Sequence, residues 1–106
     1  RKKWLTDILR SNGKVFIDSG AVSAITNEGK SLLSVGVIKV NGDFDRGEVV
    51  KCFDEEGREV AQGLINYSSD ELNMIKGFSN DKIESILGYV NEKSLIHRNN
   101  LVIIKA

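Results

Sequence analysis

The sequence has few of the residues on which disulfides and metal sites depend. Its 106 residues include one cysteine and one histidine, so no internal disulfide can form and no group of histidines can hold a metal ion. Cys52 falls within a predicted strand, where we expect a small buried apolar side chain in a reducing compartment rather than a reactive thiol. His97 is interpreted as a structural residue near Arg98, since a catalytic pair with Cys52 would require the two side chains to meet in space.

The sequence also has no excess of charge and no long apolar run. Fifteen basic and fifteen acidic side chains give a formal net charge of zero, whereas nucleic-acid modules usually carry a basic excess on one face. A local basic patch stays possible, because net charge says nothing about distribution. No apolar run approaches the roughly 20 residues of a membrane helix, and Thr6, Asp7 and Arg10 interrupt any signal-peptide core. We expect a cytoplasmic protein without a membrane partner.

The length fits a single domain that buries its own core. Because the chain begins at Arg1 without methionine, we expect it to be part of a longer protein, with residues 1–12 as a lead-in segment and 13–106 as the domain. A short amphipathic helix is predicted in the lead-in from the spacing of Trp4, Leu5, Ile8 and Leu9. Its basic cluster is interpreted as a solvated face or linker rather than as a grip on nucleic acid.

The centre of the chain predicts three short strands, at residues 37–40, 48–53 and 59–65, joined by two tight turns. Gly42 to Gly47 has the G-x-x-x-x-G spacing of a phosphate loop. Glu48 and Val49 stand where its lysine and hydroxyl residue would follow, and no helix begins there. We therefore predict a hairpin between the first two strands. Residues 54–57 predict a type I turn closed by a left-handed glycine.

Helices and further strands are predicted on both sides of this centre. A strand at 14–17 precedes a helix that Asp18 caps and that ends near Gly29. Ser68 and Glu71 match a capping box for a helix ending at Gly77, and a second helix from about 81 ends at Gly88. Short strands are predicted at 95–97 and at 101–104, the latter with the length and branching of a buried strand. The fold class is α+β, with a small, mostly antiparallel, barrel-like sheet and flanking short helices.

No active site is predicted. Paired carboxylates occur, but they lie in predicted turns, where acids that face solvent are ordinary, and no acid–base pair stands in an apolar setting. These carboxylates are Asp43, Asp45, Asp54, Glu55 and Glu56. The chain itself is therefore expected to bind no cofactor or metal and to have no enzymatic activity.

The central stretch resembles the PUA domain, named for pseudouridine synthases and archaeosine transglycosylases. The resemblance rests on the order of small and apolar residues, in which Ser34 stands where many members have proline. The matching residues are Ser31, Leu32, Leu33, Gly36, Val37, Val40, Gly42, Phe44, Gly47, Glu48, Val50, Gly57, Ala61 and Gly63. It implies a PUA-like pseudo-barrel.

The sequence on both sides of this stretch resembles one group within that family, the bacterial glutamate 5-kinases at their C-terminal PUA domain. The segments that carry this likeness are RKKW at 1–4, NYSSDEL at 66–72, ILGY at 86–89 and IHRNN at 96–100. The resemblance implies a parent transferase that phosphorylates glutamate to glutamyl 5-phosphate, the first step of proline biosynthesis, with ATP and Mg²⁺. None of the residues for that activity falls in this stretch.

Two functions are compatible with the resemblance. In the first, the domain is an accessory module that tunes the kinase or its assembly into oligomers, docking on the kinase domain through Trp4 and Leu5. In the second it binds RNA, and the family's RNA surface would then contain Lys30, Lys39 and Lys105. The alternative interpretation is that these three lysines are ordinary residues scattered over the surface. It is supported by the small number of aromatic residues nearby that could stack on bases.

Overall fold

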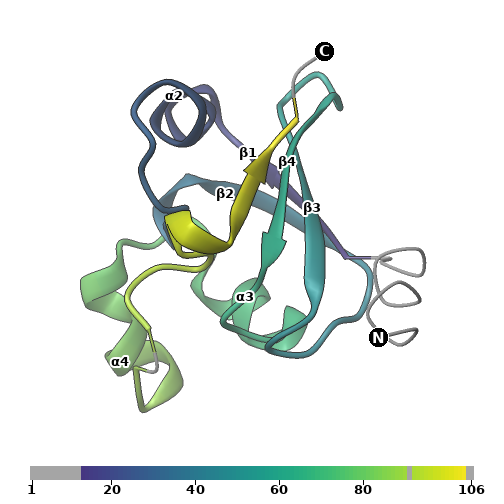
Figure 1. The fold of residues 1–106 in the computed structure, drawn as a ribbon. Coiled ribbons are helices and arrows are strands. Elements are labelled where there is room, and N and C mark those ends of the chain that lie inside the picture. The colour runs from purple at the N-terminus through teal and green to yellow at the C-terminus, as the bar shows by residue number, and fades with distance from the viewer. Residues whose placement is uncertain (1–12, 91, 105–106) are drawn as a thin grey trace.

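The structure is a computed structural model and describes residues 13–90 and 92–104. Within these residues, five strands form one mixed sheet in the order β2-β1-β3-β4-β5, and three α-helices flank it (Figure 1). The strands are β1 Lys14–Ile17, β2 Val37–Asn41, β3 Val49–Phe53, β4 Glu59–Leu64 and β5 Leu101–Ile103. The helices are α2 Ser19–Asn27, α3 Ser69–Ile75 and α4 Ile83–Leu87, with short 3-10 turns η1 Ser34–Gly36, η2 Asn80–Lys82 and η3 Arg98–Asn100.

The first strand is an interior strand of the sheet and lies between β2 and β3. β1 pairs antiparallel with β2 and parallel with β3, while the β3–β4 and β4–β5 pairs are antiparallel. The α+β class and the mostly antiparallel sheet are thus confirmed. The predicted hairpin between the first two central strands is wrong, because β1 lies between them. Turn-forming residues show where the chain reverses direction. They do not show whether the two strands that they connect pair with each other or with a third strand.

The segment from Gly42 to Gly47 is therefore a crossover past the beginning of β1 at Lys14, and the beginning of α3 holds it in place. The backbone N–H of Phe44 donates to Ser69 Oγ, and the N–H of Ser69 donates to the carbonyl of Phe44 at 2.9 Å. The Phe44 side chain is buried in the core. The β3–β4 connection, in contrast, is the predicted turn, with the N–H of Gly57 donating to the carbonyl of Asp54 at 3.0 Å.

A bridge between the segments that precede β2 and β5 connects the two ends of the sheet. The N–H of Leu32 donates to the carbonyl of Ile96 at 3.0 Å, and the N–H of Leu95 donates to the carbonyl of Leu32 at 2.7 Å. All three side chains are fully buried. This contact explains the barrel-like shape, because it brings together the chain leading into the two edge strands.

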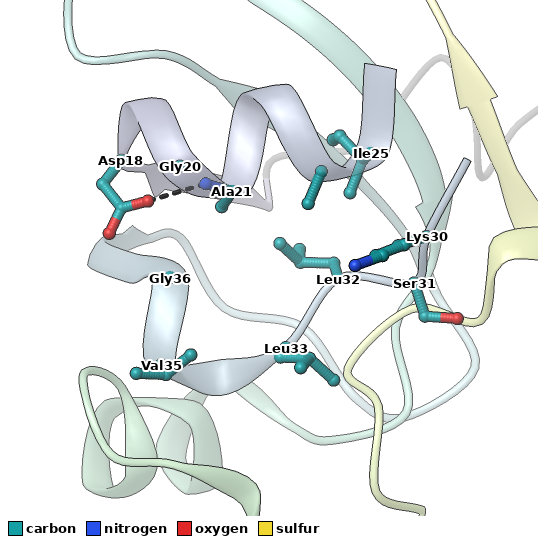
Figure 2. Close-up of a pocket in the computed structure, with 11 residues that line it drawn as sticks. Asp18, Gly20, Ala21, Ile25, Lys30, Ser31, Leu32, Leu33, Val35 and Gly36 are labelled. Carbon is teal, nitrogen blue, oxygen red and sulfur yellow. Dashed lines mark hydrogen bonds between the residues drawn. The ribbon is translucent and has the colours of Figure 1, made fainter. Parts of the chain in front are cut away.

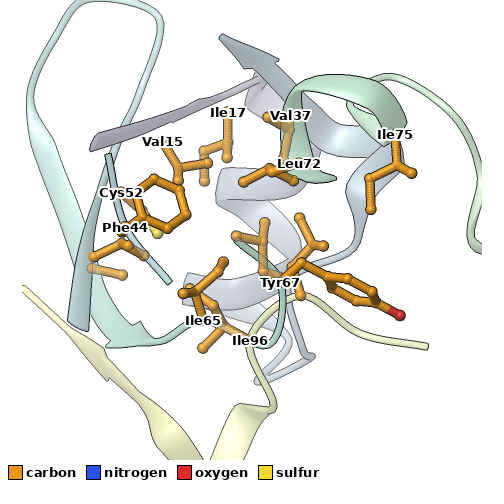
Figure 3. Close-up of a cluster of buried hydrophobic side chains, with 14 of the residues drawn as sticks. Val15, Ile17, Val37, Phe44, Cys52, Ile65, Tyr67, Leu72, Ile75 and Ile96 are labelled. Atoms are coloured by element: carbon orange, nitrogen blue, oxygen red, sulfur yellow. The ribbon is translucent and has the colours of Figure 1, made fainter. Parts of the chain in front are cut away.

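The core fills one side of the sheet (Figure 3). Alternate strand residues point into it, and each helix adds at least one fully or almost fully buried apolar side chain. These are Ile25 from α2, Leu72 and Ile75 from α3, and Ile83 from α4. All three helices thus pack toward the same side of the sheet, which we call the inner face.

The helix ends follow the predicted local chemistry. Asp18 accepts a hydrogen bond from the N–H of Ala21, and Ser68 and Glu71 form the reciprocal capping box. Gly77 and Gly88, which follow α3 and α4, have positive φ angles of 82° and 86°, where a side chain would be strained. In the part of the chain that the structure describes, no helix has the length and apolar character needed to cross a membrane.

The last strand departs from prediction. β5 is an edge strand beside β4, and the Val102 side chain is 64% exposed. Leu101 and Ile103 are half-buried. The branched run thus packs on one side only, because no further strand of the described residues pairs with it, and the prediction of a buried strand is wrong.

Candidate functional site

An apolar pocket lies between α2 and the segment from residue 30 to η1 (Figure 2). Its volume is about 410 Å³. We call it the α2 pocket. Its lining consists mainly of small and aliphatic residues, with a polar side chain at each end. They are Asp18, Gly20, Ala21, Ala24 and Ile25 on one side and Lys30, Ser31, Leu32, Leu33, Val35 and Gly36 on the other.

The close approach of η1 to the beginning of α2 requires a glycine. A Cβ atom at Gly36 would lie 2.5 Å from the Cβ of Ala21, which is closer than real Cβ contacts allow. The N–H of Asp18 donates to the carbonyl of Gly36 at 2.9 Å and fixes this contact. Gly36, which was part of the family pattern, therefore sets the width of the α2 pocket at one end.

The two charged residues of the α2 pocket already have partners. The Asp18 carboxylate accepts from the N–H of Ala21 at 2.8 Å. The Lys30 ammonium lies 3.0 Å from the Glu28 carboxylate. Between them, Figure 2 shows Leu32 pointing toward α2 beneath Ile25. With its polar ends satisfied, the pocket is suited to an apolar side chain.

The apolar surface continues from the α2 pocket toward the end of α3. Ser34 ties η1 to this region, because its hydroxyl donates to the carbonyl of Phe78 at 2.6 Å and its carbonyl accepts from the N–H of Gly77 at 2.9 Å. Leu33, Val35 and Phe78 are 38%, 52% and 50% exposed. We call these three residues the apolar rim. Large exposed apolar patches on soluble domains commonly mark contact surfaces.

The residues predicted to face RNA do not gather on one described surface. Lys30 lines the α2 pocket, whereas Lys39 lies on β2 beside Phe16 of β1. Lys105 lies outside the described residues, and so do Trp4 and Leu5, which were predicted to contact another domain.

Cys52 and His97, the two residues considered as a catalytic pair, have structural roles instead. Cys52 is fully buried, and this burial, followed by the charge of Glu59, raises the pKa of its thiol to about 12. A thiol with that pKa stays protonated at neutral pH and is a poor nucleophile. His97 Nδ1 accepts from the N–H of Asn99 at 3.1 Å and caps η3.

Among the acidic residues in the turns, Asp54 accepts hydrogen bonds from the backbone of its own turn. Asp54 accepts from the N–H groups of Glu56 and Arg58, at 3.0 and 2.9 Å, and from Arg58 Nε at 3.0 Å. The hydrogen bond from the Arg58 backbone is the largest cause that lowers the pKa of this carboxyl. Among residues 13–90 and 92–104, no group of three or more His, Cys, Asp or Glu side chains could hold a metal ion.

A second surface, which was not predicted from the sequence, lies on the side of the sheet opposite the core. Lys14, Phe16, Lys39, Lys51 and Phe53 lie there on three neighbouring strands, and we call these five residues the basic sheet face. A signal was present, because these residues occupy the polar or exposed phase of the strands at 14–17 and 49–53. Their proximity depends on β1 lying between β2 and β3, which the sequence did not reveal.

The chain matches the family model of the PUA domain over residues 13–87. It is also similar to the glutamate 5-kinases of Hahella chejuensis and Cupriavidus taiwanensis, with 54% and 52% identity over 104 residues. Each alignment covers 98% of this chain but only 27% and 28% of the respective relative. The chain thus spans little more than a quarter of the length of these curated relatives.

Solved structures share the fold. A PUA domain from Aeropyrum pernix, solved as a tartrate complex, superposes with a TM-score of 0.59 at 25% identity, covering 81% of this chain and 41% of that one. A chain of an H/ACA RNP bound to a substrate RNA has a TM-score of 0.60 at 22% identity, covering 89% of this chain and 24% of its own. The pseudo-barrel, the match over residues 13–87 and these likenesses agree, and the chain belongs to the PUA domain family.

Proposed function

We propose that this chain is the C-terminal PUA domain of a glutamate 5-kinase and serves that enzyme as a non-catalytic accessory module. The observation that carries the proposal is the identity of more than half of the aligned residues with glutamate 5-kinases over almost the whole chain. The alignments extend over 104 residues and are therefore not confined to residues 13–87, which match the PUA family model.

In this proposal the chemistry belongs to the rest of the parent enzyme. ATP, Mg²⁺ and glutamate bind to the kinase domain in the cytoplasm, and the product is glutamyl 5-phosphate for proline biosynthesis. The polar groups of the α2 pocket are engaged in a helix cap and an ion pair, which suits a contact surface better than a reaction site. This domain therefore acts on the kinase through its position and not through a reacting group.

The α2 pocket and the apolar rim are the surface that we assign to the kinase domain. Val35 and Phe78 are each about half exposed, so they are available to a partner without any rearrangement of the core. Covering them together with the pocket would remove apolar surface from water, which is the main driving force of most protein association. The lead-in segment, with Trp4 and Leu5, would connect the two domains and would contact the kinase domain as well.

The test compares the full-length enzyme with a version that ends before Arg1. We expect the shortened enzyme to keep glutamate phosphorylation but to change in its inhibition by proline or in its oligomer size, both measured beside the kinetics. Complete loss of turnover in a folded shortened enzyme would mean that the domain takes part in catalysis, contrary to the proposal. If kinetics, proline inhibition and oligomer size are all unchanged, the proposed accessory role is wrong.

Point variants test the docking surface. In the full-length enzyme, Val35→Ser and Phe78→Ser together should reproduce the change seen on truncation. Val102→Ser is the matched control, since Val102 is 64% exposed on β5 and does not line the α2 pocket. If the control has the same effect as the double variant, the apolar rim is not the contact.

The second function, RNA binding through Lys30, Lys39 and Lys105, receives less support from the described residues, because Lys30 is paired with Glu28 and Lys39 lies on another surface. We expect a pool of structured tRNA to bind no more tightly than roughly 10⁻⁵ M near physiological salt, as in non-specific binding. Fluorescence anisotropy measures this affinity. Sub-micromolar binding that falls on Lys30→Glu or Lys39→Glu would favour the RNA-binding function instead.

A further inference from the structure

The last strand of the sheet has one edge that pairs with no other strand of the described residues. The register with β4 places Val102 opposite Gln62. The N–H of Ile104 donates to the carbonyl of Val60 at 2.8 Å. Because main-chain groups alternate in direction along an antiparallel strand, those of Val102 also face β4 and those of Ile103 face away from it. No described residue forms a hydrogen bond with the N–H or the carbonyl of Ile103, so this edge presents a donor and an acceptor to another strand.

The side chains along this edge are apolar and lack the usual protection against pairing. Edge strands are commonly protected by lysine, by proline or by a bulge. Residues 101–104 are all apolar, and the register of β5 is regular. On the outer face, which is the side of the sheet opposite the inner face, Leu64, Val102 and Ile104 are 40%, 64% and 37% exposed. We call these three residues the outer edge patch. Its burial against another apolar surface is favourable.

The two ends of β5 carry charges of opposite sign. Arg98 of η3 precedes the strand, and within the described residues its side chain forms no ion pair. The β3–β4 turn lies at the other end, where it leads into the start of β4 beside the end of β5 (Figure 1). Arg58 of this turn is already paired with Asp54 and Glu56. Glu55 is exposed and, in the described part of the chain, forms no ion pair. One end of the edge is therefore basic and the other acidic.

We propose that the free edge of β5 pairs antiparallel with the same edge of a second copy of this chain, about a two-fold axis at Ile103. The N–H of each Ile103 then donates to the carbonyl of the other, and the two sheets continue as one. Paired residues on antiparallel strands point to the same side of a sheet, so Val102 of one copy lies beside Ile104 of the other. The outer edge patches of the two copies thus join.

The charges at the two ends favour a second copy over an unrelated strand. Antiparallel pairing places the Arg98 end of each copy beside the Glu55 end of the other, so that opposite charges meet twice. Two strand spacings, about 10 Å, separate the β4 strand of one copy from the β5 strand of the other, and an arginine and a glutamate side chain together can span that distance. The formal net charge of zero adds no general repulsion between copies. An interface of this kind is complementary to itself, as a two-fold dimer requires.

The experiment is sedimentation equilibrium of this 106-residue chain between about 10 µM and about 1 mM, a range suited to the weak contacts that small interfaces form. We expect a monomer–dimer equilibrium with a dissociation constant of roughly 10⁻⁴ M. Val102→Lys should raise this constant about tenfold or more, because lysine in an edge strand opposes pairing and the substitution enters the interface twice. Met74→Lys is the matched control, since Met74 is 52% exposed on α3 and the change adds the same charge.

Charge reversal tests the antiparallel arrangement. Arg98→Glu and Glu55→Arg should each weaken dimerisation about threefold at low salt, because each places like charges together at both ends of the interface. The double variant should return the dissociation constant to within about twofold of the unchanged chain. A double variant that dimerises no better than the single variants would overturn the proposed arrangement.

Hydrogen exchange of single amides, followed by NMR, locates the contact without any substitution. With a dissociation constant of roughly 10⁻⁴ M, the Ile103 amide should exchange about fourfold more slowly at about 1 mM than at about 20 µM, because it is bonded only in the dimer. The Val102 amide, which already faces β4, should change less. The proposal is wrong if the chain stays monomeric at about 1 mM, if Met74→Lys weakens dimerisation as much as Val102→Lys, or if exchange at Ile103 is independent of concentration. The α2 pocket and kinase activity play no part in these measurements, so their failure would leave the accessory role standing.

Discussion

The inner and outer faces of the one sheet are built from the same strands but differ in what their residues can do. On β1 and β3 the inner residues Val15, Ile17, Val50 and Cys52 have no exposed surface, whereas the residues that alternate with them include two lysines and two phenylalanines. The alternation of a strand separates the two sets completely. It lets a small domain keep a dry core on one side and a free surface on the other.

This difference separates stability from recognition. Inner residues contact several neighbours in a close-packed interior, where a change of even one methylene group is costly. Outer residues contact solvent and a few cross-strand neighbours, so most changes there alter the free energy of unfolding by no more than about 0.5 kcal/mol. Substitutions on the two faces should therefore have separate consequences.

The largest effect is expected at Gly63 on β4. A Cβ atom there would lie 2.6 Å from Ile96 Cγ2 and 2.8 Å from the carbonyl oxygen of Asn100, and the backbone oxygen cannot move without disturbing η3. Gly63→Val should lower the free energy of unfolding by more than about 2 kcal/mol through overpacking. Chemical denaturation measures it.

The neighbour on the opposite face is the control for this substitution. Gln62→Thr should change stability by no more than about 0.5 kcal/mol, because Gln62 lies on the outer face. A midpoint for Gly63→Val close to that of the unchanged chain would show that the inner face is loosely packed there and would weaken the comparison.

A smaller loss is expected where α3 begins over the inner face. Ser68 Oγ accepts from the N–H of Glu71 at 3.2 Å, and Glu71 Oε1 accepts from the N–H of Ser68 at 3.0 Å. Ser68→Ala should cost about 1 kcal/mol and Glu71→Ala less, because Ser68 satisfies a donor inside the first turn. If thermal melts show no loss for Ser68→Ala, the cap contributes nothing to holding α3 on the core.

The sequence predicted the positions of most helices and strands but not the order of the strands in the sheet. Most strand and helix positions among the described residues were correct, because they depend on local signals such as the Asp18 cap and the β-branched run at 37–40. The predicted strand at 95–97 is instead an isolated bridge at Ile96. The order of the strands was not predictable in the same way. The insertion of β1 between β2 and β3 joins residues near 15 with residues near 52, and no local pattern reports which distant strand fills a gap.

The candidate surfaces follow the same rule. Lys39 was identified from the family resemblance, but its neighbours Phe16 and Phe53 were not, because the three lie on different strands and meet only in the folded sheet. The α2 pocket depends on the approach of η1 to α2, and the only sequence sign of that approach is Gly36. Its apolar rim includes Phe78, which is 43 residues or more from the rest of the rim along the chain.

The β3–β4 turn lies between the two faces, and its stability should depend on pH. Hydrogen bonds, chiefly from the Arg58 backbone, lower the pKa of Asp54 in the folded chain. A lowered folded pKa means that the contribution is present above the unfolded value of about 3.9 and is lost as pH falls through the folded pKa. Asp54→Asn should destabilise the domain at neutral pH, and the difference should shrink below about pH 4. A difference that is independent of pH would mean that the carboxylate charge is not what Asp54 contributes.

The smallest effect, and the one that differs in sign, is expected on the outer face. Lys51 lies beside Lys14 with no described carboxylate partner, so Lys51→Gln should raise the free energy of unfolding by roughly 0.2–0.5 kcal/mol at low salt by removing repulsion between like charges. The gain should fall toward zero at about 1 M salt, where the screening length is about 3 Å. Lys30→Gln removes the same charge from a pair with Glu28 at 3.0 Å, and it should instead lower stability by a few tenths of a kcal/mol at low salt. Urea titrations of both variants at two salt concentrations measure the signs. A loss of stability for Lys51→Gln that persists at high salt would mean that packing of the Lys51 stem on the sheet outweighs the repulsion between its charge and that of Lys14.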